Sequence, residues 1–506
     1  MASEPTVVDV CIVGGGPTGL LTGLLLTRLG ASVCIIDGKP GPLELGRADA
    51  LNARTQQYLE AADLLDELLP TGLKCNTSST YENGKWLSRQ SDWWVGLEHC
   101  LHKNFLMIGQ PVVEKMLAEK LEGIVRFNEK FQSITEDDEG VDVVTESGLK
   151  VRARYAVGSD GAKSLVRAQI GASFTGTKPE MLWSVLDTFI DTDFPRCPEI
   201  VTFQLNGQSR VSWIPRERDM CRFYVLLEGE VSQARAEESI KAHMAPHRVE
   251  FTKTEWYSTF DVKERIASTF VSKEASGRII LAGDAAHVHS VNGGQGLNTG
   301  LADAFNLAWR LATVTKNPNL QPGAAQKLIR SYDTERRNTA RDVIDVAARL
   351  VRDTVHTAKQ YVGTIEKSAG YITGMGVSYS EHGSPLVKTS EHGFWKAGNR
   401  CPDMVLQKPE GGQNMLYTEV SYGKFLLLQV GGKGDAQVGF NGVVQPYHIQ
   451  PTSAVSAGKE GVKTYTGDWV SADDSFLVLV RPDMYIGYVG KDEEEIKRYL
   501  ADLYIS

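Results

Sequence analysis

The sequence lacks the features that mark secreted, membrane-spanning and nucleic-acid-binding proteins. Its seven cysteines are scattered and form no Cys-x-x-Cys pair, so no disulfide framework is expected. The apolar segment 19–29 is too short to cross a bilayer, and the polar first residues do not form a signal peptide. A formal net charge of −9 argues against a nucleic-acid partner. These absences predict a cytoplasmic protein with free thiols and no membrane span.

A metal site is also not expected. His287 and His289 are two residues apart, but the surrounding cysteines and carboxylates do not complete a ligand set. What remains is ordinary for a globular protein: 506 residues, 42% of them hydrophobic and 23% charged. This length is enough for two or three domains with a large core.

The first informative motif is a glycine-rich loop between a strand and a helix. A β-branched run over 7–13 predicts a buried parallel strand, and the loop 14–19 follows at once. Leucines at helical spacing over 20–29 then predict a helix, and a second strand over 33–36 ends at Asp37. This order of strand, Gly-x-Gly-x-x-Gly, helix, strand and acid predicts a dinucleotide site.

Each glycine of this loop has a physical role. Gly14 makes the tight turn, Gly16 lets the backbone approach a pyrophosphate, and Gly19 allows close helix–strand packing. The helix N-terminus, which begins around Thr18, offers amide donors and a positive dipole to phosphates. Asp37 can accept hydrogen bonds from an unphosphorylated ribose, which favours FAD or NAD over NADP at this loop.

A second glycine-rich segment lies far along the chain. The apolar strand 278–282 opens on Gly283 and Asp284, and Asp284 can hold a ribityl hydroxyl. The segment 293–298 then leads into a helix whose first amides and dipole would stabilise negative charge on a reduced isoalloxazine ring. Its candidate cofactor residues are Gly294, Gly296, Leu297 and Asn298. The pair of loops suits FAD, whose two ends can be held by distant parts of the sequence.

Together with the block from Gly158 to Arg167, the two glycine motifs resemble the three signatures of class A flavoprotein aromatic monooxygenases, in particular the phenol hydroxylase branch. The resemblance covers roughly residues 6–350. It implies that Asp160 and Arg167 contribute to the FAD site and to the use of NADPH or NADH. Gln110 resembles the family glutamine beside the ribityl chain, although an ordinary polar helix start remains an alternative.

The charged segment after the second strand supplies two arginines. Arg47 and Arg54 can face the FAD phosphates or the ring edge as bidentate donors. The alternative is a solvated surface turn.

A candidate catalytic triad follows from the resemblance. Asp49, Arg216 and Tyr224 match the family triad residue by residue, with Arg216 and Tyr224 on the two strands of a predicted hairpin. The resemblance implies that Asp49 takes the proton of a phenol, Arg216 stabilises the phenolate or orients a carbonyl, and Tyr224 relays the proton or fixes the ring. Without the resemblance, such a hairpin pair usually belongs to surface packing.

The predicted fold class is α/β. A Rossmann-type FAD-binding domain comprises residues 1–78, 108–171 and 273–345, and a substrate-binding β-sheet domain comprises 79–107 and 172–272. A helical segment and linker over 346–397 then precede a domain over 398–506, which resembles the thioredoxin-like tail of the family without its Cys-x-x-Cys. That tail implies a homodimer. The basic stretch 330–341 is expected to form salt-bridged, solvent-facing turns.

These features predict an FAD-dependent monooxygenase that uses NADPH or NADH and O2. The resemblance implies a flavin hydroperoxide that transfers one oxygen atom to an electron-rich aromatic ring, most simply a phenol. One departure is Val291, which occupies the position of a family proline. The same chemistry applied to oxidative decarboxylation of a hydroxybenzoate, epoxidation or Baeyer–Villiger oxidation therefore stays open, and a non-catalytic flavoprotein is the remaining alternative.

Overall fold

The computed structural model describes residues 4–92, 97–178, 182–195, 198–205, 208–261, 263–290, 294–354, 358–453 and 461–505. Side chains at 208–210, 351–354 and 358–362 are not described. Val291, the departure from the family pattern, lies outside these residues. In the described ranges, no helix combines the length and apolar character that a bilayer crossing needs. The six cysteines in these ranges are buried thiols.

The first sheet carries the glycine loops. Its order is β8-β2-β1-β11-β10-β9, and β19 pairs with the second half of β11. β1 is parallel to β2 and β11, whereas β9 and β10 are antiparallel additions at one edge. Residues 10–13 of β1 are buried, as expected for a strand covered on both faces. The strands are β1 (Thr6–Val13), β2 (Val33–Asp37), β8 (Val125–Phe127), β9 (Phe131–Glu136), β10 (Val141–Thr145), β11 (Lys150–Gly158) and β19 (Ile279–Leu281).

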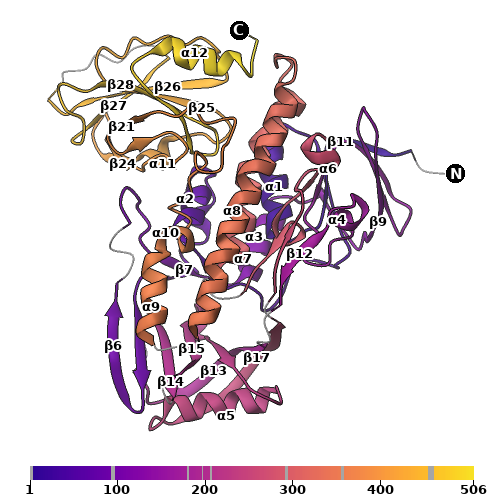
Figure 1. The fold of residues 1–506 in the computed structure, drawn as a ribbon, viewed down its shortest axis with the longest axis vertical. Helices are drawn as coiled ribbons and strands as arrows, with labels where there is room; N and C mark the ends of the chain where they lie inside the picture. Colours follow the sequence, from indigo (N-terminus) through magenta and orange to yellow (C-terminus); the bar gives the residue numbers. More distant parts are fainter. Residues whose placement is uncertain are drawn as a thin grey trace.

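Helices pack against this sheet and connect it to the rest of the molecule. α1 (Pro17–Arg28) packs on both α7 (Gln295–Lys316) and α3 (Gln110–Glu119). α7 and the long α8 (Ala324–Thr354) lie side by side through the centre of the molecule (Figure 1). The shorter helices are α2 (Ala53–Ala61), α4 (Leu165–Gln169), α6 (Ser272–Ala275), α9 (Ala358–Lys367), α10 (Ala369–Ile372) and α11 (Leu416–Glu419).

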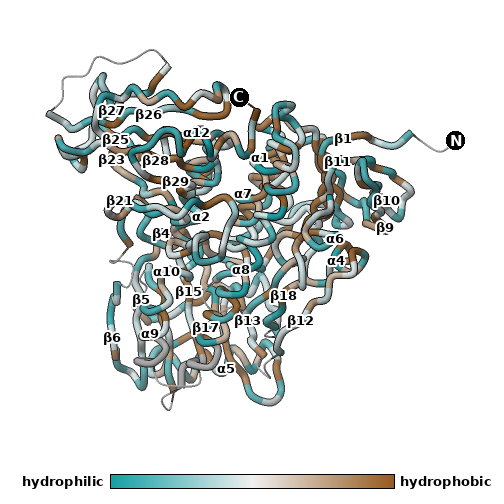
Figure 2. The backbone as a smooth tube through the Cα atoms, turned by 45° about the horizontal axis from the view of Figure 1, so that its top comes forward, coloured by the Kyte–Doolittle hydropathy of each residue, from teal (hydrophilic) through white to brown (hydrophobic). Residues whose placement is uncertain are grey.

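The second sheet has seven strands in the order β17-β13-β16-β15-β14-β5-β6, with α5 (Gln233–Met244) against it. β5 and β6 complete one edge of this sheet, and β6 is mostly hydrophilic (Figure 2). The strands are β5 (Ser78–Glu82), β6 (Lys85–Ser91), β13 (Leu182–Thr192), β14 (Ile200–Leu205), β15 (Gln208–Pro215), β16 (Cys221–Leu226) and β17 (Val249–Asp261). Many of its aromatic side chains form an ordinary core under α5, including Tyr81, Phe203 and Phe223.

Small sheets join these units. One has the order β3-β7-β4 and another β12-β18-β20, and a two-stranded ribbon pairs β21 with β22. Their bounds are β3 (Ala50–Leu51), β4 (Leu73–Cys75), β7 (Phe105–Met107), β12 (Phe174–Thr177), β18 (Glu264–Ala267), β20 (His287–Val288), β21 (Glu391–His392) and β22 (Trp395–Lys396).

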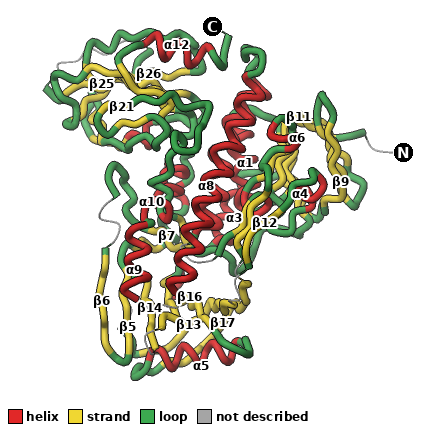
Figure 3. Tube along the Cα trace, in the orientation of Figure 1, coloured by secondary structure: helices red, strands yellow, loops and turns green. Residues whose placement is uncertain are grey.

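Strands and loops with the terminal helix α12 make up most of the C-terminal part (Figure 3). Its strands form a mixed sheet in the order β24-β23-β27-β26-β25-β28-β29. β25, β26 and β27 are parallel, and β28 and β29 add as antiparallel strands. The bounds are β23 (Val405–Gln407), β24 (Gln413–Met415), β25 (Phe425–Gly431), β26 (Val444–Pro451), β27 (Lys463–Gly467), β28 (Ser475–Val480), β29 (Ile486–Gly490) and α12 (Glu493–Ala501). Its core is continuous with that of the first sheet.

Two expectations about the connecting segments are wrong. The stretch expected as a linker is packed, since Tyr379 is 0% and Trp395 2% exposed. The basic stretch of α8 is not wholly solvent-facing, because Glu335 and Arg336 are buried with carboxylate or guanidinium partners. A charged residue on a helix is buried here because a neighbouring element supplies the opposite charge.

One buried carboxyl lies where the C-terminal part contacts the segment before β7. The Asp403 backbone N–H donates to the His99 carbonyl, and Asp403 Oδ1 accepts from the Tyr417 N–H. Asp403 Oδ2 is buried without a hydrogen-bond partner among the described residues. Burial raises the pKa of Asp403 to about 7, and Glu60 contributes in the same direction. Folding above that pH therefore has to bury a charged carboxylate.

Asp403→Asn is expected to stabilise the protein more at pH 8 than at pH 5. The folded pKa of about 7 exceeds the ordinary value, so the cost of the charge is present above pH 7 and is relieved as the pH falls toward 4. The variant never carries the charge, and its gain at pH 8 should be on the order of 1–4 kcal/mol. Melting temperatures between pH 5 and 8 measure the difference. Asp138→Asn at an exposed site is the control, and a pH-independent difference would contradict the assignment.

Candidate functional site

The two glycine loops meet in space around Thr18, at the start of α1. A Cβ added to Gly283 would be 2.7 Å from Thr18 Oγ1, and one added to Gly300 of α7 would be 2.4 Å from the same atom. Thr18 therefore fills the space between the two motifs. This contact supports the expectation that distant parts of the chain hold one long ligand.

The glycines of the first loop have different surroundings. Gly14 has φ +111° and its added Cβ would be 2.3 Å from the Ser159 carbonyl oxygen, so no side chain fits there. An added Cβ at Gly19 would be 2.0 Å from the Gly14 carbonyl oxygen. At Gly16 nothing lies within 4 Å. The loop thus packs tightly on its inner side and leaves open space at Gly16.

Both helices that start at these loops lack a side-chain cap. Gly16 is the N-cap of α1 and Gly294, with φ +64°, is the N-cap of α7. The first amides of a helix need acceptors from outside the helix, and a phosphate or a ring oxygen can supply them. The backbone at Gly294, Gly296 and Leu297 is therefore placed where the sequence predicts an acceptor.

Asp37 lies at the end of β2 beside the first loop. Its Oδ2 accepts from the Gly15 N–H at 2.5 Å and its Oδ1 accepts from the Lys39 N–H at 2.7 Å. The carboxylate is partly exposed, with 10% side-chain exposure. This arrangement fixes the carboxylate at the rim of the loop, where the sequence predicts a ribose.

The block from Gly158 to Arg167 contacts the second glycine-rich segment. Asp160 accepts from Ser164 Oγ and from the Leu165 N–H, so its carboxylate holds the start of α4. Arg167 Nη1 donates to the Ala285 carbonyl at 2.7 Å. In the ligand-free chain Asp160 therefore supports the motif, and Arg167 fastens that motif to the segment next to Asp284.

A strained turn places Arg47 and Gln110 together. Arg47 has φ +66°, and the Trp256 ring packs against the preceding glycine. Gln110 Oε1 accepts from the Ala48 N–H at 3.3 Å, and its backbone N–H donates to the Ala48 carbonyl. Arg222 donates to the Arg47 carbonyl. Contacts from three elements thus hold this turn.

Asp284 faces this turn across the site. The residue is exposed, yet desolvation by surrounding protein atoms raises the pKa of its carboxyl, while His287 and Arg47 act in the opposite direction. The influence of Arg47 shows that the predicted ribityl acid and the predicted phosphate or ring arginine lie within electrostatic reach of each other. They come from sequence positions far apart.

Two of the side chains predicted to bind the cofactor are hydrogen-bonded to other parts of the protein. Asn298 Oδ1 accepts from the Asn52 N–H at 2.8 Å, and its Nδ2 donates to the Ala50 carbonyl, so the side chain joins α7 to β3. The unpaired amides at the start of α7 are those of residues 294–297, so Asn298 supports the site through its side chain and does not offer its own backbone N–H to the cofactor. Arg54 was expected near the FAD phosphates or the ring edge, and that expectation is wrong. It is 2% exposed and donates to Tyr417 Oη and the Met484 carbonyl of the C-terminal part.

The structure brings two members of the predicted triad together. Tyr224 Oη donates to Asp49 Oδ2 at 3.2 Å. Burial raises the pKa of Tyr224, with Asp49 acting in the same direction, so its hydroxyl stays protonated. Arg216 does not reach Asp49: its guanidinium binds Glu217 Oε1 and Oε2 at 2.7 and 2.9 Å and Asp187 Oδ1 at 3.4 Å.

Arg222 is the residue that the sequence reasoning missed. Its Nε and Nη2 donate to the two Asp187 oxygens at 2.6 Å each, and its Nη1 lies 3.4 Å from Asp49 Oδ2. It is fully buried. The signal was present, because Arg222 precedes Tyr224 by two residues on β16 and therefore shares its face of the sheet. Asp187, opposite Arg222 on β13, completes the arrangement.

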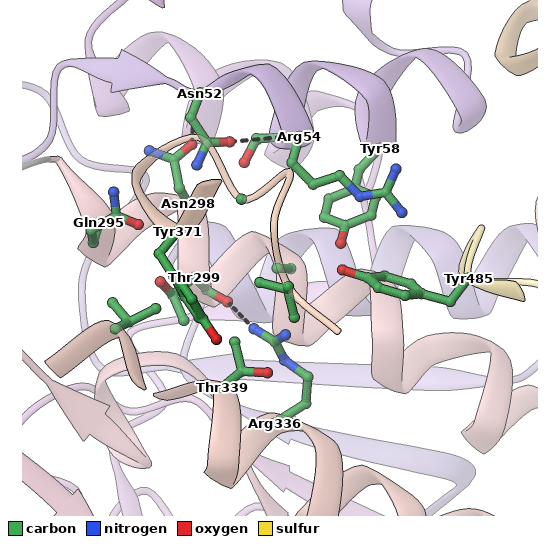
Figure 4. A pocket seen from close by; sticks show the side chains of 15 residues that line it. Asn52, Arg54, Tyr58, Gln295, Asn298, Thr299, Arg336, Thr339, Tyr371 and Tyr485 are labelled. Carbon is green, nitrogen blue, oxygen red and sulfur yellow. Dashed lines mark hydrogen bonds between the residues drawn. The ribbon is translucent and has the colours of Figure 1, made fainter. Parts of the chain in front are cut away.

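A small cavity lies behind the start of α7 (Figure 4). Its volume of about 30 Å³ is enough for roughly one or two water molecules. Figure 4 shows Arg336 on one side and the Arg54–Tyr58–Tyr485 group on another. It is too small for an aromatic substrate.

The unpaired backbone amides and the open space beside the first glycine loop fit FAD. Open space at Gly16, two uncapped helix starts and an accessible acid at Asp37 suit a dinucleotide. Moreover, His287 Nδ1 is buried without a partner among the described residues, which is common where a ligand or water completes the hydrogen bonding.

Comparison with known proteins agrees with this geometry. Residues 7–347 match the family model described as an FAD binding domain. A phenol 2-monooxygenase of Aspergillus fumigatus is 26% identical over 98% of this chain and 95% of its own length. A 3-hydroxybenzoate 4-monooxygenase of Comamonas testosteroni is 29% identical over 67% of this chain and 59% of its own length.

Solved structures share the fold over the whole chain. The flavin-dependent monooxygenase PieE, in complex with FAD and substrate, has a TM-score of 0.79 at 20% identity and covers 99% of this chain and 100% of its own. Aklavinone-11 hydroxylase, with FAD and aklavinone, has a TM-score of 0.79 at 23% identity, with 99% of each chain covered.

Proposed function

This chain belongs to the FAD-dependent class A aromatic monooxygenases, and from that premise we propose that it hydroxylates a phenol held at Asp49 and Tyr224. The observation that carries the proposal is the 3.2 Å hydrogen bond between Tyr224 Oη and Asp49 Oδ2. FAD, reduced by NADPH or NADH, supplies the electrophilic oxygen from O2. The residues of the chain then have to orient the substrate and move its proton.

Asp49 is the proposed proton acceptor. It is 5% exposed and lies beside the turn that carries Arg47, so a substrate at this position would be shielded from bulk water. Loss of the phenol proton makes the ring more nucleophilic, and a buried carboxylate within hydrogen-bonding reach can take that proton. Tyr224, whose hydroxyl stays protonated, can donate to Asp49 or to the substrate oxygen and thereby relay or position the proton.

Arg216 is better assigned as a positioning residue than as a direct substrate ligand. Glu217 and Asp187 occupy its guanidinium, and Asp187 in turn binds Arg222. The chain Arg216–Asp187–Arg222 ends next to Asp49. Arg222 is likewise a positioning residue: Asp187 and the Arg47 carbonyl occupy its guanidinium, which places a fixed positive charge 3.4 Å from Asp49.

The proposed cofactor site follows from the contacts of each element. The α1 start and Asp37 would hold the adenosine and pyrophosphate end. Arg47, Gln110 and Asp284 would hold the ribityl end, and the α7 start would face the ring. The residues assigned to this site are Gly14, Gly16, Thr18, Gly19, Asp37, Arg47, Gln110, Asp160, Asp284, Gly294, Gly296, Leu297 and Asn298.

We further propose that residues 398–506 form a thioredoxin-like unit that supports a homodimer. The parallel strands at the centre of its sheet, the antiparallel β28 and β29 and the terminal α12 favour such a unit. The buried thiols favour work in a reducing compartment such as the cytoplasm.

Substrate-stimulated oxidation of NADPH or NADH tests the function. The yellow holoenzyme should consume the nucleotide faster with a suitable phenol, and mass spectrometry should find a product heavier by one oxygen atom. A gain of oxygen with loss of a carboxyl group would instead indicate oxidative decarboxylation. Nucleotide oxidation that no aromatic compound stimulates would contradict the proposal.

A further inference from the structure

A group of buried charges lies immediately behind the second glycine loop and outside the three sequence motifs. Asp303 of α7 is 0% exposed and Arg336 of α8 is 2% exposed. Arg336 Nε donates to Asp303 Oδ1 at 2.7 Å. Burying such a pair is costly unless its geometry is good and its remaining polar atoms are satisfied. The surroundings meet that condition.

Asp303 uses its second oxygen on the cofactor loop itself. Oδ2 accepts from the Gly283 N–H at 2.9 Å and lies 2.8 Å from His287 Nε2. Gly283 directly precedes Asp284, and His287 is three residues after it. One carboxylate therefore holds the loop on both sides of the predicted ribityl acid. Burial disfavours the charged form, yet Arg336 and His287 hold the pKa of Asp303 below its ordinary value.

Arg336 is itself fixed from three directions. Besides Asp303, its Nη1 donates to Tyr379 Oη at 3.2 Å and its Nη2 to the Thr299 carbonyl at 3.4 Å. Figure 4 shows the last of these bonds at the edge of the small cavity. Tyr379 stacks on Tyr485 of the C-terminal part with ring centroids 4.1 Å apart. The guanidinium therefore connects the cofactor loop to the first turn of α7 and to the C-terminal part.

We propose that Asp303 and Arg336 are positioning residues for FAD: Asp303 sets the conformation of the 283–287 loop, and Arg336 holds the Asp303 carboxylate in the orientation that reaches this loop. Because the loop presents Asp284, and because α7 presents its first amides, a change in this pair should alter how tightly FAD is bound and at what potential it is reduced. The inference rests on the family assignment of FAD, but it is independent of the substrate.

A second buried arginine on the same pair of helices provides a matched control. Arg310 of α7 is 0% exposed and binds Glu335 Oε2 at 2.7 Å and Asp483 Oδ2 at 3.3 Å. It resembles Arg336 in burial and in carboxylate pairing, but no hydrogen bond of its own among the described residues goes to the 283–287 loop. Loss of a buried ion pair alone should therefore affect Arg310 and Arg336 variants alike.

The test compares Arg336→Met, Asp303→Asn and Arg310→Met. FAD is titrated into each apoprotein without substrate, well below the melting temperature of that apoprotein, and the reduction potential of the bound flavin is measured. Arg336→Met and Asp303→Asn should each raise the FAD dissociation constant about tenfold, the lower end of the loss seen when the hydrogen-bond partners that orient metal ligands are removed. Both variants should also shift the reduction potential of the bound flavin. Arg310→Met should instead lower the melting temperature, keep the FAD dissociation constant within about twofold and leave the potential unchanged.

If Arg336→Met does not fold, Arg336→Lys keeps the charge but cannot bridge Asp303, Tyr379 and Thr299 together, and it should show a smaller effect in the same direction. Unchanged FAD affinity and potential in the Asp303 and Arg336 variants would overturn the proposal, as would an equal change in Arg310→Met. Because no substrate is present, neither result depends on whether the enzyme hydroxylates phenols.

Discussion

Gly16→Ala is expected to weaken FAD binding roughly ten- to hundredfold while the apoprotein keeps its fold. Gly16 has φ −85°, which alanine adopts without strain, and its added Cβ would meet no protein atom within 4 Å. The methyl group would instead occupy the space through which a pyrophosphate approaches the start of α1. Forcing such a contact costs about 1–3 kcal/mol, equivalent to roughly a ten- to hundredfold loss of affinity.

Titration of the apoprotein with FAD and thermal melting of the same sample separate these effects. Gly41→Ala is the matched control, because that position is also open and has no left-handed φ. Gly14→Ala is the opposite control: with φ +111° and a 2.3 Å approach to the Ser159 carbonyl oxygen, it should damage both the fold and the cofactor site. FAD affinity in Gly16→Ala equal to that of the natural chain would place the cofactor elsewhere.

The surroundings of these glycines show which parts of the site can be predicted from sequence. The packing at Gly19 against Gly14 and the acid at the end of β2 depend on neighbours within one strand–helix–strand unit. The same holds for the uncapped start of α7. These features depend on residues that are close together in the sequence, so a local sequence pattern is enough to predict them.

Long-range partners were not predictable in this way. Arg54 follows the cofactor turn in sequence, yet its guanidinium binds Tyr417 Oη, whose position depends on the packing of the C-terminal part. Arg216 matches a family triad, but one of the two acids that occupy it, Asp187, lies on β13 and comes close to it only in the folded sheet. The pairing of Asp303 with Arg336 likewise requires α7 and α8 to pack together. Each of these contacts depends on tertiary structure, which spacing along the chain does not encode.

Asp49→Asn should have the largest effect on the chemical step. If Asp49 accepts the phenol proton, its loss should lower the rate of substrate hydroxylation about 10²- to 10⁴-fold, the usual contribution of a positioned base. The fold should survive, because Arg222 keeps its two 2.6 Å contacts with Asp187. Rapid-reaction measurement of product formation, together with the flavin absorbance spectrum, distinguishes a slow proton step from loss of FAD.

The choice of substrate decides whether Asp49 acts as a base. A phenol that is already ionised at the assay pH needs no proton acceptor, so Asp49→Asn should impair its hydroxylation much less than that of a neutral phenol. Tyr224→Phe should slow the reaction of the neutral phenol by a smaller factor, since it removes the donor but leaves the carboxylate. Tyr257→Phe, which changes a hydroxyl paired with Ser184 in the same sheet, is the matched control and should react normally. An equal loss for ionised and neutral phenols in Asp49→Asn would show that the carboxylate positions the substrate without taking its proton.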